Sequence, residues 1–101
     1  MKIKHSEKEI KVVIKLSLET GNYVLLPHAR QRCKERKVLP RDIEFALKNE
    51  KRIKARDRFD DSYESWSYTF QGKTIDERDL RIVIIIDDKL KVVTVVVLDE
   101  E

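Results

Sequence analysis

The stretch PHARQRCKER, residues 27–36, combines residue types that bind phosphate and transfer protons. His28, Arg32 and Arg36 follow one another at spacings of four residues, so on a helix they share one face. The planar guanidinium group of an arginine can pair with two phosphate oxygens at once. A histidine near a helix start is biased toward the neutral form, which can accept a proton. This helix stripe predicts a phosphate site with His28 as acid or base; an exposed structural histidine is the alternative interpretation.

An aromatic alternation later in the chain offers a second proton carrier. Trp66, Tyr68 and Phe70 alternate with polar residues, so on a strand they point to one face. Aromatic residues at this period usually belong to a core. A tyrosine at the edge of a core can also stack on a base or donate a proton to a leaving group. Tyr68 is therefore the second catalytic candidate, as a proton carrier, with Arg32 and Arg36 to stabilise negative charge on the oxygens of a reacting phosphate.

Charge is distributed unevenly along the chain. Residues 27–58 contain 12 Lys and Arg against 5 Asp and Glu, a net charge of +7, whereas residues 59–101 have a net charge of −6. Such asymmetry indicates a basic surface that can meet a polyanion, although a solvated charged face gives the same pattern. The side chains expected to contact a nucleic-acid phosphate backbone are Arg30, Arg32, Arg36, Lys54 and Arg56.

Several other kinds of site are excluded or disfavoured by composition. The chain has two glycines, too few for a glycine-rich phosphate loop, and one cysteine, Cys33, so an internal disulfide or a zinc site with several cysteines is excluded. We expect Cys33 to be a small buried hydrophobic residue. No cofactor and no metal site are predicted. A magnesium nuclease stays open as an alternative, but Asp57, Asp60 or Glu64 would have to converge with acids on other strands.

Size and hydropathy indicate one globular domain over residues 1–101. Charged and hydrophobic residues each make up 41% of the chain, so there is enough apolar material for a core. The N-terminal segment MKIKHSEKEI has no apolar signal region, and no apolar run approaches the length of a membrane-spanning helix. A cytoplasmic protein with no membrane association is the expectation.

Three helices are predicted in the first half of the chain. The first spans about residues 6–20, where Ser6 and Glu9 form a capping box and Gly21 ends the helix. The second covers residues 28–37, just after Pro27. The third begins at Pro40 and extends to about residue 51. The apolar segment 23–26 between the first two is a short connection or strand.

The period then changes from helical to two. Four strands are predicted, at residues 52–59, 64–72, 80–87 and 90–98. Because consecutive strands usually lie side by side, we expect an α+β fold in which N-terminal helices precede a four-stranded antiparallel meander and cover one of its faces. The last two strands are apolar on both faces, so they are central, or their second face is covered by the first helix, a partner chain or a second copy in a homodimer. The predicted buried set is Trp66, Phe70, Ile82, Ile84 and Val95.

The segment PHARQRCKERKVLPRDIEFAL resembles the opening motif of a family of small bacterial proteins of unknown function. In that pattern, His-Ala, a later arginine and Glu-Arg precede an apolar corner and a helix, and the domain closes on an apolar strand with an internal threonine. Arg32, Glu35, Arg36 and Thr94 fit it, and the likeness covers roughly residues 25–98. This family is similar to the RelE/ParE-like toxins, which have helices followed by an antiparallel sheet.

The resemblance implies a metal-independent endoribonuclease, or a gyrase poison as in the ParE branch. RelE-like toxins often place their working Arg, Lys and Tyr on the sheet, and the counterparts here are Tyr68 and Arg81, which adds Arg81 to the catalytic candidates. The expected function is a toxin-like endoribonuclease or RNA-binding protein that acts through a basic helix. Its expected partners are RNA, an antitoxin-like protein or a second copy of the chain. A non-catalytic protein-interaction module on the same fold is the alternative.

Overall fold

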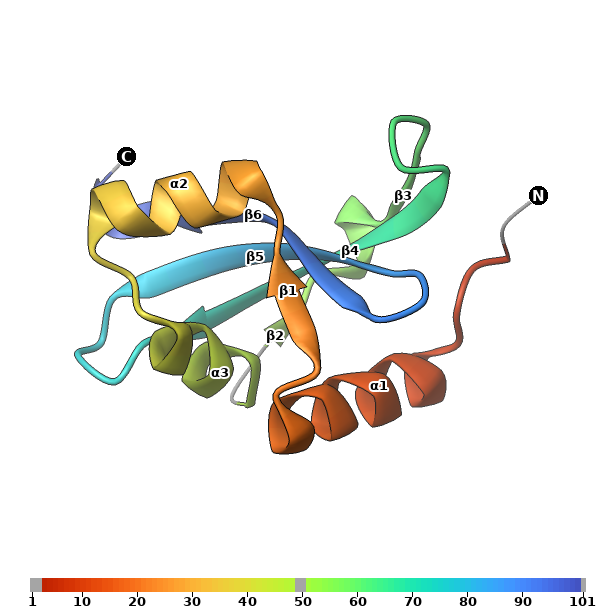
Figure 1. Cartoon of the computed structure of the whole chain (residues 1–101), viewed down its shortest axis with the longest axis horizontal. Helices are drawn as coiled ribbons and strands as arrows, with labels where there is room; N and C mark the ends of the chain where they lie inside the picture. Colours follow the sequence, from red (N-terminus) through yellow and green to blue (C-terminus); the bar gives the residue numbers. More distant parts are fainter. Residues whose placement is uncertain (1–2, 49–50, 101) are drawn as a thin grey trace.

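A computed structural model describes residues 3–48 and 51–100 of the chain, and within them it contains helices in the first half and strands mainly in the second (Figure 1). The α-helices are α1 (Glu7–Thr20), α2 (Pro27–Arg36) and α3 (Pro40–Lys48). The strands are β1 (Tyr23–Leu25), β2 (Lys51–Arg52), β3 (Arg58–Asp60), β4 (Ser65–Lys73), β5 (Asp79–Ile86) and β6 (Leu90–Val97). Two 3₁₀-helices, η1 (Lys54–Arg56) and η2 (Leu98–Glu100), complete the set.

Local sequence signals set the starts of the predicted helices and the end of α1, whereas Lys51, predicted to belong to the third helix, lies in β2. The Ser6 hydroxyl accepts from the Glu9 backbone N–H at 3.1 Å, and the Glu9 carboxylate accepts from the Ser6 backbone N–H at 3.0 Å, which completes the capping box. Gly21 ends α1 in the left-handed region, with φ of 72°. Pro27 and Pro40 are the first residues of α2 and α3, where a missing N–H costs no hydrogen bond.

The strands form one open sheet in the order β1-β6-β5-β4-β2, and β3 also pairs with β4. All pairs are antiparallel except β1 with β6, which is parallel and places Tyr23 opposite Leu90. The chain passes from β1 directly into α2, which packs along β6. The Tyr23 hydroxyl also donates to the Glu44 carboxylate of α3 at 2.5 Å. Segment 23–26 therefore joins the sheet at its edge and links it to the helices.

The prediction of a four-stranded meander was wrong, because the described residues form a sheet of six strands. The expected strand 52–59 is interrupted: the backbone N–H groups of Arg56 and Asp57 bond to the carbonyls of Ile53 and Lys54, which makes the turn of η1. Its two flanking pieces, β2 and β3, pair separately with β4. The coarser prediction, an α+β fold with helices before most of the sheet, is confirmed.

One hydrophobic cluster fills the space between the sheet and the three helices. Phe70, Ile82, Ile84 and Val95 are buried there as predicted, whereas Trp66 is half-buried. Helix α3 lies so close to β4 that a Cβ added at Gly72 would stand 2.3 Å from the Ala46 carbonyl oxygen. This face of the sheet is called the inner face below, and the face on the other side is called the outer face.

Candidate nucleic-acid interface

Alternating side chains in η1 and β3 divide the basic segment between the two faces of the sheet. Arg58 pairs with Ser67, whose side chain is on the outer face, and Arg56 lies with it around a hollow on that face. Asp57, between the two arginines, instead contacts groups of the inner side. Lys54 and Arg56 are exposed, as is Arg58. The local sequence therefore places two arginines outward and one carboxylate inward.

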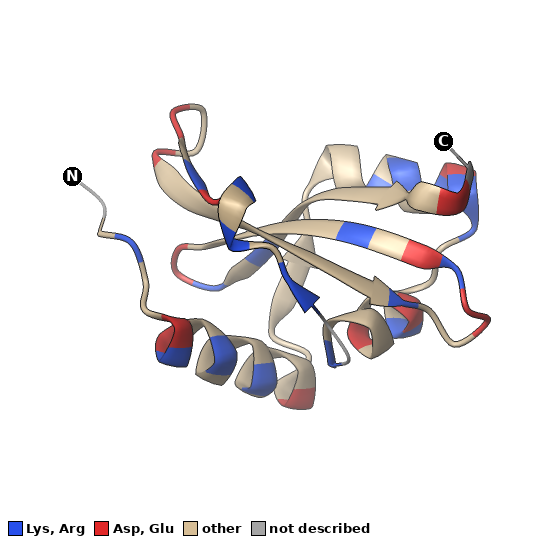
Figure 2. Ribbon diagram, turned by 180° about the vertical axis from the view of Figure 1, so that it is seen from behind, with Lys and Arg blue, Asp and Glu red and all other residues tan. Residues whose placement is uncertain are grey.

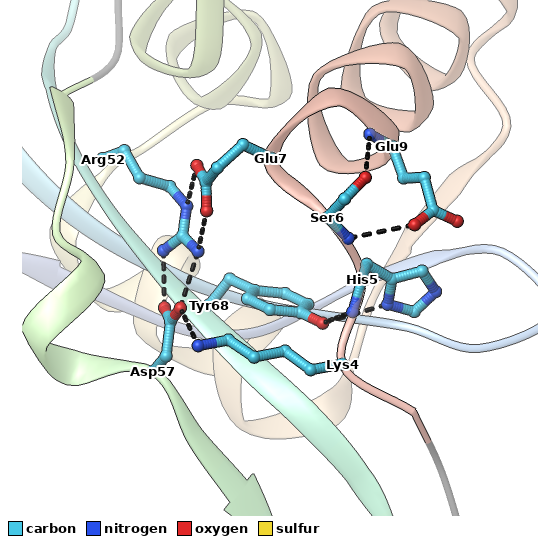
Figure 3. A network of polar contacts seen from close by, with 8 residues as sticks. All are labelled: Lys4, His5, Ser6, Glu7, Glu9, Arg52, Asp57 and Tyr68. Atoms are coloured by element: carbon cyan, nitrogen blue, oxygen red, sulfur yellow. Dashed lines mark hydrogen bonds and ion pairs between the residues drawn. The ribbon is translucent and has the colours of Figure 1, made fainter.

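Asp57 is fixed by a bidentate ion pair with Arg52 (Figure 3). Nη1 of Arg52 donates to Oδ1 of Asp57 at 2.5 Å, and Nη2 donates to Oδ2 at 2.6 Å. The Asp57 side chain is only 3% exposed and that of Arg52 is 12% exposed. Burial alone would raise the pKa of the Asp57 carboxyl, but hydrogen bonds and charges from Arg52 and Lys4 outweigh it, so the pKa lies below its usual value.

The network continues into the first residue of α1 and the segment that precedes it (Figure 3). Glu7 accepts from Nε and Nη2 of Arg52 at 3.1 and 2.9 Å, and Lys4 Nζ lies 3.1 Å from the Asp57 carboxylate. The Arg52 guanidinium also lies 5.2 Å from the Tyr68 ring centroid. Two cations and two carboxylates thus neutralise one another. Asp57, which also borders the hollow on the outer face, therefore has its charge compensated.

The hollow on the outer face has a volume of about 320 Å³. Its lining carries two arginines, the carboxylates Asp57 and Asp60, and hydroxyl side chains of the sheet: Arg56, Arg58, Asp57, Asp60, Ser67, Thr69 and Thr94, with Ala55, Val83 and Val93. The guanidinium groups of Arg56 and Arg58 form no hydrogen bond or ion pair with other residues in the described part of the chain. This hollow and the residues that line it, Arg56 and Arg58 included, are called the outer hollow below.

Arg81 lies on the same face as the outer hollow. On β5 it pairs with Gln71 and Val96, two positions before Val83, which lines the hollow. Residues two apart on a strand point to one face and are separated by about 7 Å. The Arg81 Nε is buried and has no hydrogen-bond partner among the described residues. An unsatisfied buried donor costs free energy.

The residues of the α2 stripe lie on the other side of the sheet. His28 and Arg30 are exposed, and Arg32 and Arg36 are half-buried. Nη2 of Arg30 donates to the Leu25 carbonyl at 3.2 Å, which holds that side chain near β1. Figure 2 shows Lys and Arg along α2 and again around η1 and β3, so the basic segment contributes to two separate surfaces.

Tyr68 is fully buried on the inner face. Its hydroxyl accepts from the His5 backbone N–H at 2.9 Å and lies 3.0 Å from His5 Nδ1. Burial raises the pKa of this hydroxyl. The structure therefore does not bring the three catalytic candidates together: His28 is exposed on α2, Tyr68 is in the core, and Arg81 is on the outer face.

Sequence reasoning selected Arg56 and Lys54 but missed their neighbours. Arg58, Ser67, Thr69 and Val83 line the outer hollow with Arg56. The alternation Arg56-Asp57-Arg58 was a signal that could have indicated one basic face. Nothing in the local sequence indicated that Asp57 pairs with Arg52. The pairing with Lys4 was not predictable either, because Lys4 is far away along the chain.

Other groups with potential chemistry lie outside the outer hollow. Cys33 is buried, and burial, with the charge of Asp42, raises the pKa of its thiol. Among residues 3–48 and 51–100, no three His, Cys, Asp or Glu side chains are grouped so that they could hold a metal ion. None of the described helices is long and apolar enough to cross a membrane.

A second hollow, of about 420 Å³, lies between α1 and α3. Ile14, Leu18 and Leu47 line it together with Lys11 and other charged residues, Lys15, Glu19 and Lys48. Its lining is mainly apolar, and lysines outnumber the single acid at its border. This α1–α3 groove differs from the outer hollow, whose lining is mainly polar.

Comparison with known families gives one match. Residues 25–97 match the family described as a domain of unknown function, DUF4258. Comparisons with curated proteins and with solved structures gave no match. The matched range contains α2, η1, β3 and the sheet residues of the outer hollow, whereas α1 lies before it. Because the match covers well over half of its length, the chain belongs to the DUF4258 family.

Proposed function

We propose that this protein binds RNA, and that the outer hollow holds the phosphate backbone. The observation that carries the proposal is the pair Arg56 and Arg58, which line one hollow without a charged partner among the described residues. Surface arginines that have no internal role are available for phosphate, which each can bind in a bidentate manner. Arg81 adds a third guanidinium on the same face.

The neutralised network beneath the hollow supports this assignment. Asp57 is the acid nearest in sequence to both arginines, and its charge is compensated by Arg52 and Lys4. An uncompensated carboxylate at this position would repel phosphate. Asp60 also lines the hollow, and its carboxylate accepts from the Ser62 backbone N–H at 2.9 Å. The cations therefore outnumber the unpaired acids at this surface.

The resemblance to RelE/ParE-like toxins that the sequence motif suggests, which the comparisons with known proteins do not show, is our reason for choosing RNA as the polyanion. In such toxins the working cations lie on the sheet, and the outer hollow is a sheet surface. Cleavage is a separate part of the proposal, because His28 and Tyr68 do not line this hollow. We therefore propose binding as the primary function and treat cleavage as a prediction with its own test.

Binding is tested by fluorescence anisotropy with a labelled single-stranded RNA at low salt. We expect Arg56→Ala combined with Arg58→Ala to weaken binding by roughly tenfold or more, because two phosphate contacts are lost. Arg30→Ala with Lys34→Ala removes the same charge from exposed positions of α2 and is the matched control. We expect this control to weaken binding much less. Equal losses would move the RNA site away from the outer hollow.

Cleavage is tested by incubating the protein with end-labelled RNA, with and without EDTA, from pH 5 to pH 9. If His28 is the acid or base, His28→Ala lowers the cleavage rate by about 10²–10⁴-fold while the protein stays folded. RNA that stays intact at every pH would contradict catalysis and leave RNA binding as the function.

A protein-interaction role is the second candidate, and the α1–α3 groove favours it. Its apolar lining and its lysines suit an acidic amphipathic helix, such as a segment of an inhibitory partner. A designed Glu/Leu-rich helical peptide is the probe, and a Lys/Leu-rich peptide of equal length is the control. Calorimetry should detect binding of the acidic peptide only, and Leu18→Lys should abolish it. Equal binding of both peptides would contradict this candidate.

A further inference from the structure

Next to the outer hollow, the β3–β4 hairpin presents aromatic side chains to solvent. Phe59 follows Arg58 on β3 and pairs with Trp66 of β4. The two rings meet edge to face, with centroids 6.2 Å apart and planes at 79°. Phe59 is nevertheless 38% exposed, and Tyr63 in the adjoining turn is 39% exposed. Two aromatic residues of this hairpin are therefore accessible to a ligand.

The same hairpin carries its cations and its aromatic rings on opposite sides. Successive residues of a strand point to opposite faces, so Arg58 points toward the outer hollow and Phe59 points away from it. Lys4 Nζ lies 5.0 Å from the Trp66 ring centroid while it is also paired with the Asp57 carboxylate. Within the described residues β3 pairs with β4 alone, so its other edge is a border of the sheet. The hairpin extends away from α2 and α3 (Figure 1).

We infer that this hairpin stacks unpaired nucleobases on Phe59, with Tyr63 available in the adjoining turn, and that the ligand of the outer hollow is therefore single-stranded RNA. The inference rests on the proposed function, because Arg56 and Arg58 supply the phosphate contacts. An RNA strand that crosses the border at β3 can keep its phosphates on the arginine side and turn its bases to the aromatic side. In a duplex the base faces are covered by neighbouring pairs, so only unpaired bases can stack on a side chain.

Trp66 makes the inference measurable, because it is the only tryptophan in the chain. Its indole contacts Phe59, so a base that stacks on Phe59 changes the surroundings of the fluorophore. We expect single-stranded RNA to quench the tryptophan fluorescence at saturation. Inorganic polyphosphate, which has phosphates but no bases, should bind to the arginines and cause little quenching.

The mutational test uses Phe59→Leu, with Phe59→Tyr as the conservative variant, and circular dichroism to show that both are folded. Loss of one stacked base lowers affinity by roughly 5- to 100-fold. We expect Phe59→Leu to lose affinity for single-stranded RNA by this factor, Phe59→Tyr to retain affinity, and polyphosphate binding to be equal in all three proteins. A duplex of the same sequence should bind more weakly than the single strand.

Two results would overturn the inference, and they separate it from the proposed function. If Phe59→Leu binds single-stranded RNA as tightly as the unmodified protein, or if the duplex binds equally well, stacking is wrong while phosphate binding by the outer hollow stands. If neither RNA nor polyphosphate binds to the unmodified protein, both the proposed function and the stacking inference fail.

Discussion

Arg52 and Arg56 belong to the same short basic segment, yet their surroundings differ completely. Arg52 donates to two carboxylates, lies over the Tyr68 and Phe70 rings and is almost buried. Arg56 is exposed beside a hollow and has no charged partner in the described part of the chain. The first arginine connects β2 to Glu7 of α1 and to Asp57 just after η1, whereas the second makes no such connection within the described residues.

This difference shows that the net charge of a segment does not define a binding surface. The network around Arg52 uses positive charge for structure, because Glu7 and Asp57 neutralise it. Only the cations that remain unpaired can attract a polyanion at useful strength. The inner and outer faces of the sheet should therefore respond in opposite ways to mutation: inner changes affect stability, and outer changes affect binding.

The largest effect on folding is expected from substitutions at two neighbouring residues of β5. Ile84 is completely buried on the inner face, and Val83 lines the outer hollow. Ile84→Asp should unfold or aggregate the protein, because an unpaired charge in the core costs several kcal/mol. Val83→Asp should leave the protein folded and weaken RNA binding by adding negative charge. Thermal melting and size-exclusion chromatography test this, and a soluble Ile84→Asp with an unchanged melting temperature would contradict the assignment of faces.

The next largest effect on stability is expected from a substitution of Arg52, compared with the same substitution of Arg56. Arg52→Met should lower the free energy of unfolding by about 3 kcal/mol, because it leaves Asp57 buried without its bidentate partner. Arg56→Met removes the same charge from an exposed position and should change the free energy of unfolding by less than about 0.5 kcal/mol. Urea titrations measure both values. Equal losses of stability in the two variants would remove the distinction between a structural and a free arginine.

Acid should weaken the inner network in a predictable direction. The pKa of Asp57 is lower in the folded protein than in the unfolded chain, so its stabilising contribution is complete above the ordinary carboxyl pKa of about 4. That contribution is lost as the pH falls through the lower, folded-state pKa. Asp57→Asn should be less stable than the unmodified protein at pH 7, and the difference should shrink toward pH 2.5. A constant difference over this range, measured by urea unfolding, would show that Asp57 is not ionised in the network.

Tyr68→Phe should have the smallest effect of this series. It removes the hydroxyl that bonds to His5 and leaves the buried ring in place, so the expected loss of stability is about 1 kcal/mol. RNA affinity should not change, because the hydroxyl is on the inner face. A loss of RNA binding or cleavage in a variant with a nearly unchanged melting temperature would instead give Tyr68 the functional role that the sequence suggested.

Local signals were sufficient for most elements of the fold. The Ser6–Glu9 box and Gly21 marked the ends of α1, and the β-branched runs marked β5 and β6. The interruption of strand 52–59 was not predictable, because the partners of Arg52 and Asp57 include Glu7 and Lys4, more than 40 residues away. The parallel pairing of β1 also depends on where α2 packs.

The candidate site was less predictable than the fold. Spacing could place His28, Arg32 and Arg36 on one helical face, but only the three-dimensional arrangement decides which strand residues lie near them. Tyr68 and Arg81 belong to opposite faces of the sheet. The choice between these faces depends on packing against α1 and α3, which the alternating pattern of a single strand does not contain.

The salt dependence of RNA affinity tests the central claim most directly. For single-stranded RNA, the slope of log affinity against log salt concentration changes by about 0.7 for each phosphate contact. Arg56→Ala with Arg58→Ala should therefore make the slope shallower by about 1.4. Lys11→Ala with Lys15→Ala, which removes the same charge from α1, should leave the slope unchanged. Slopes that are equal in the unmodified protein and the Arg56/Arg58 variant would contradict RNA binding at the outer hollow.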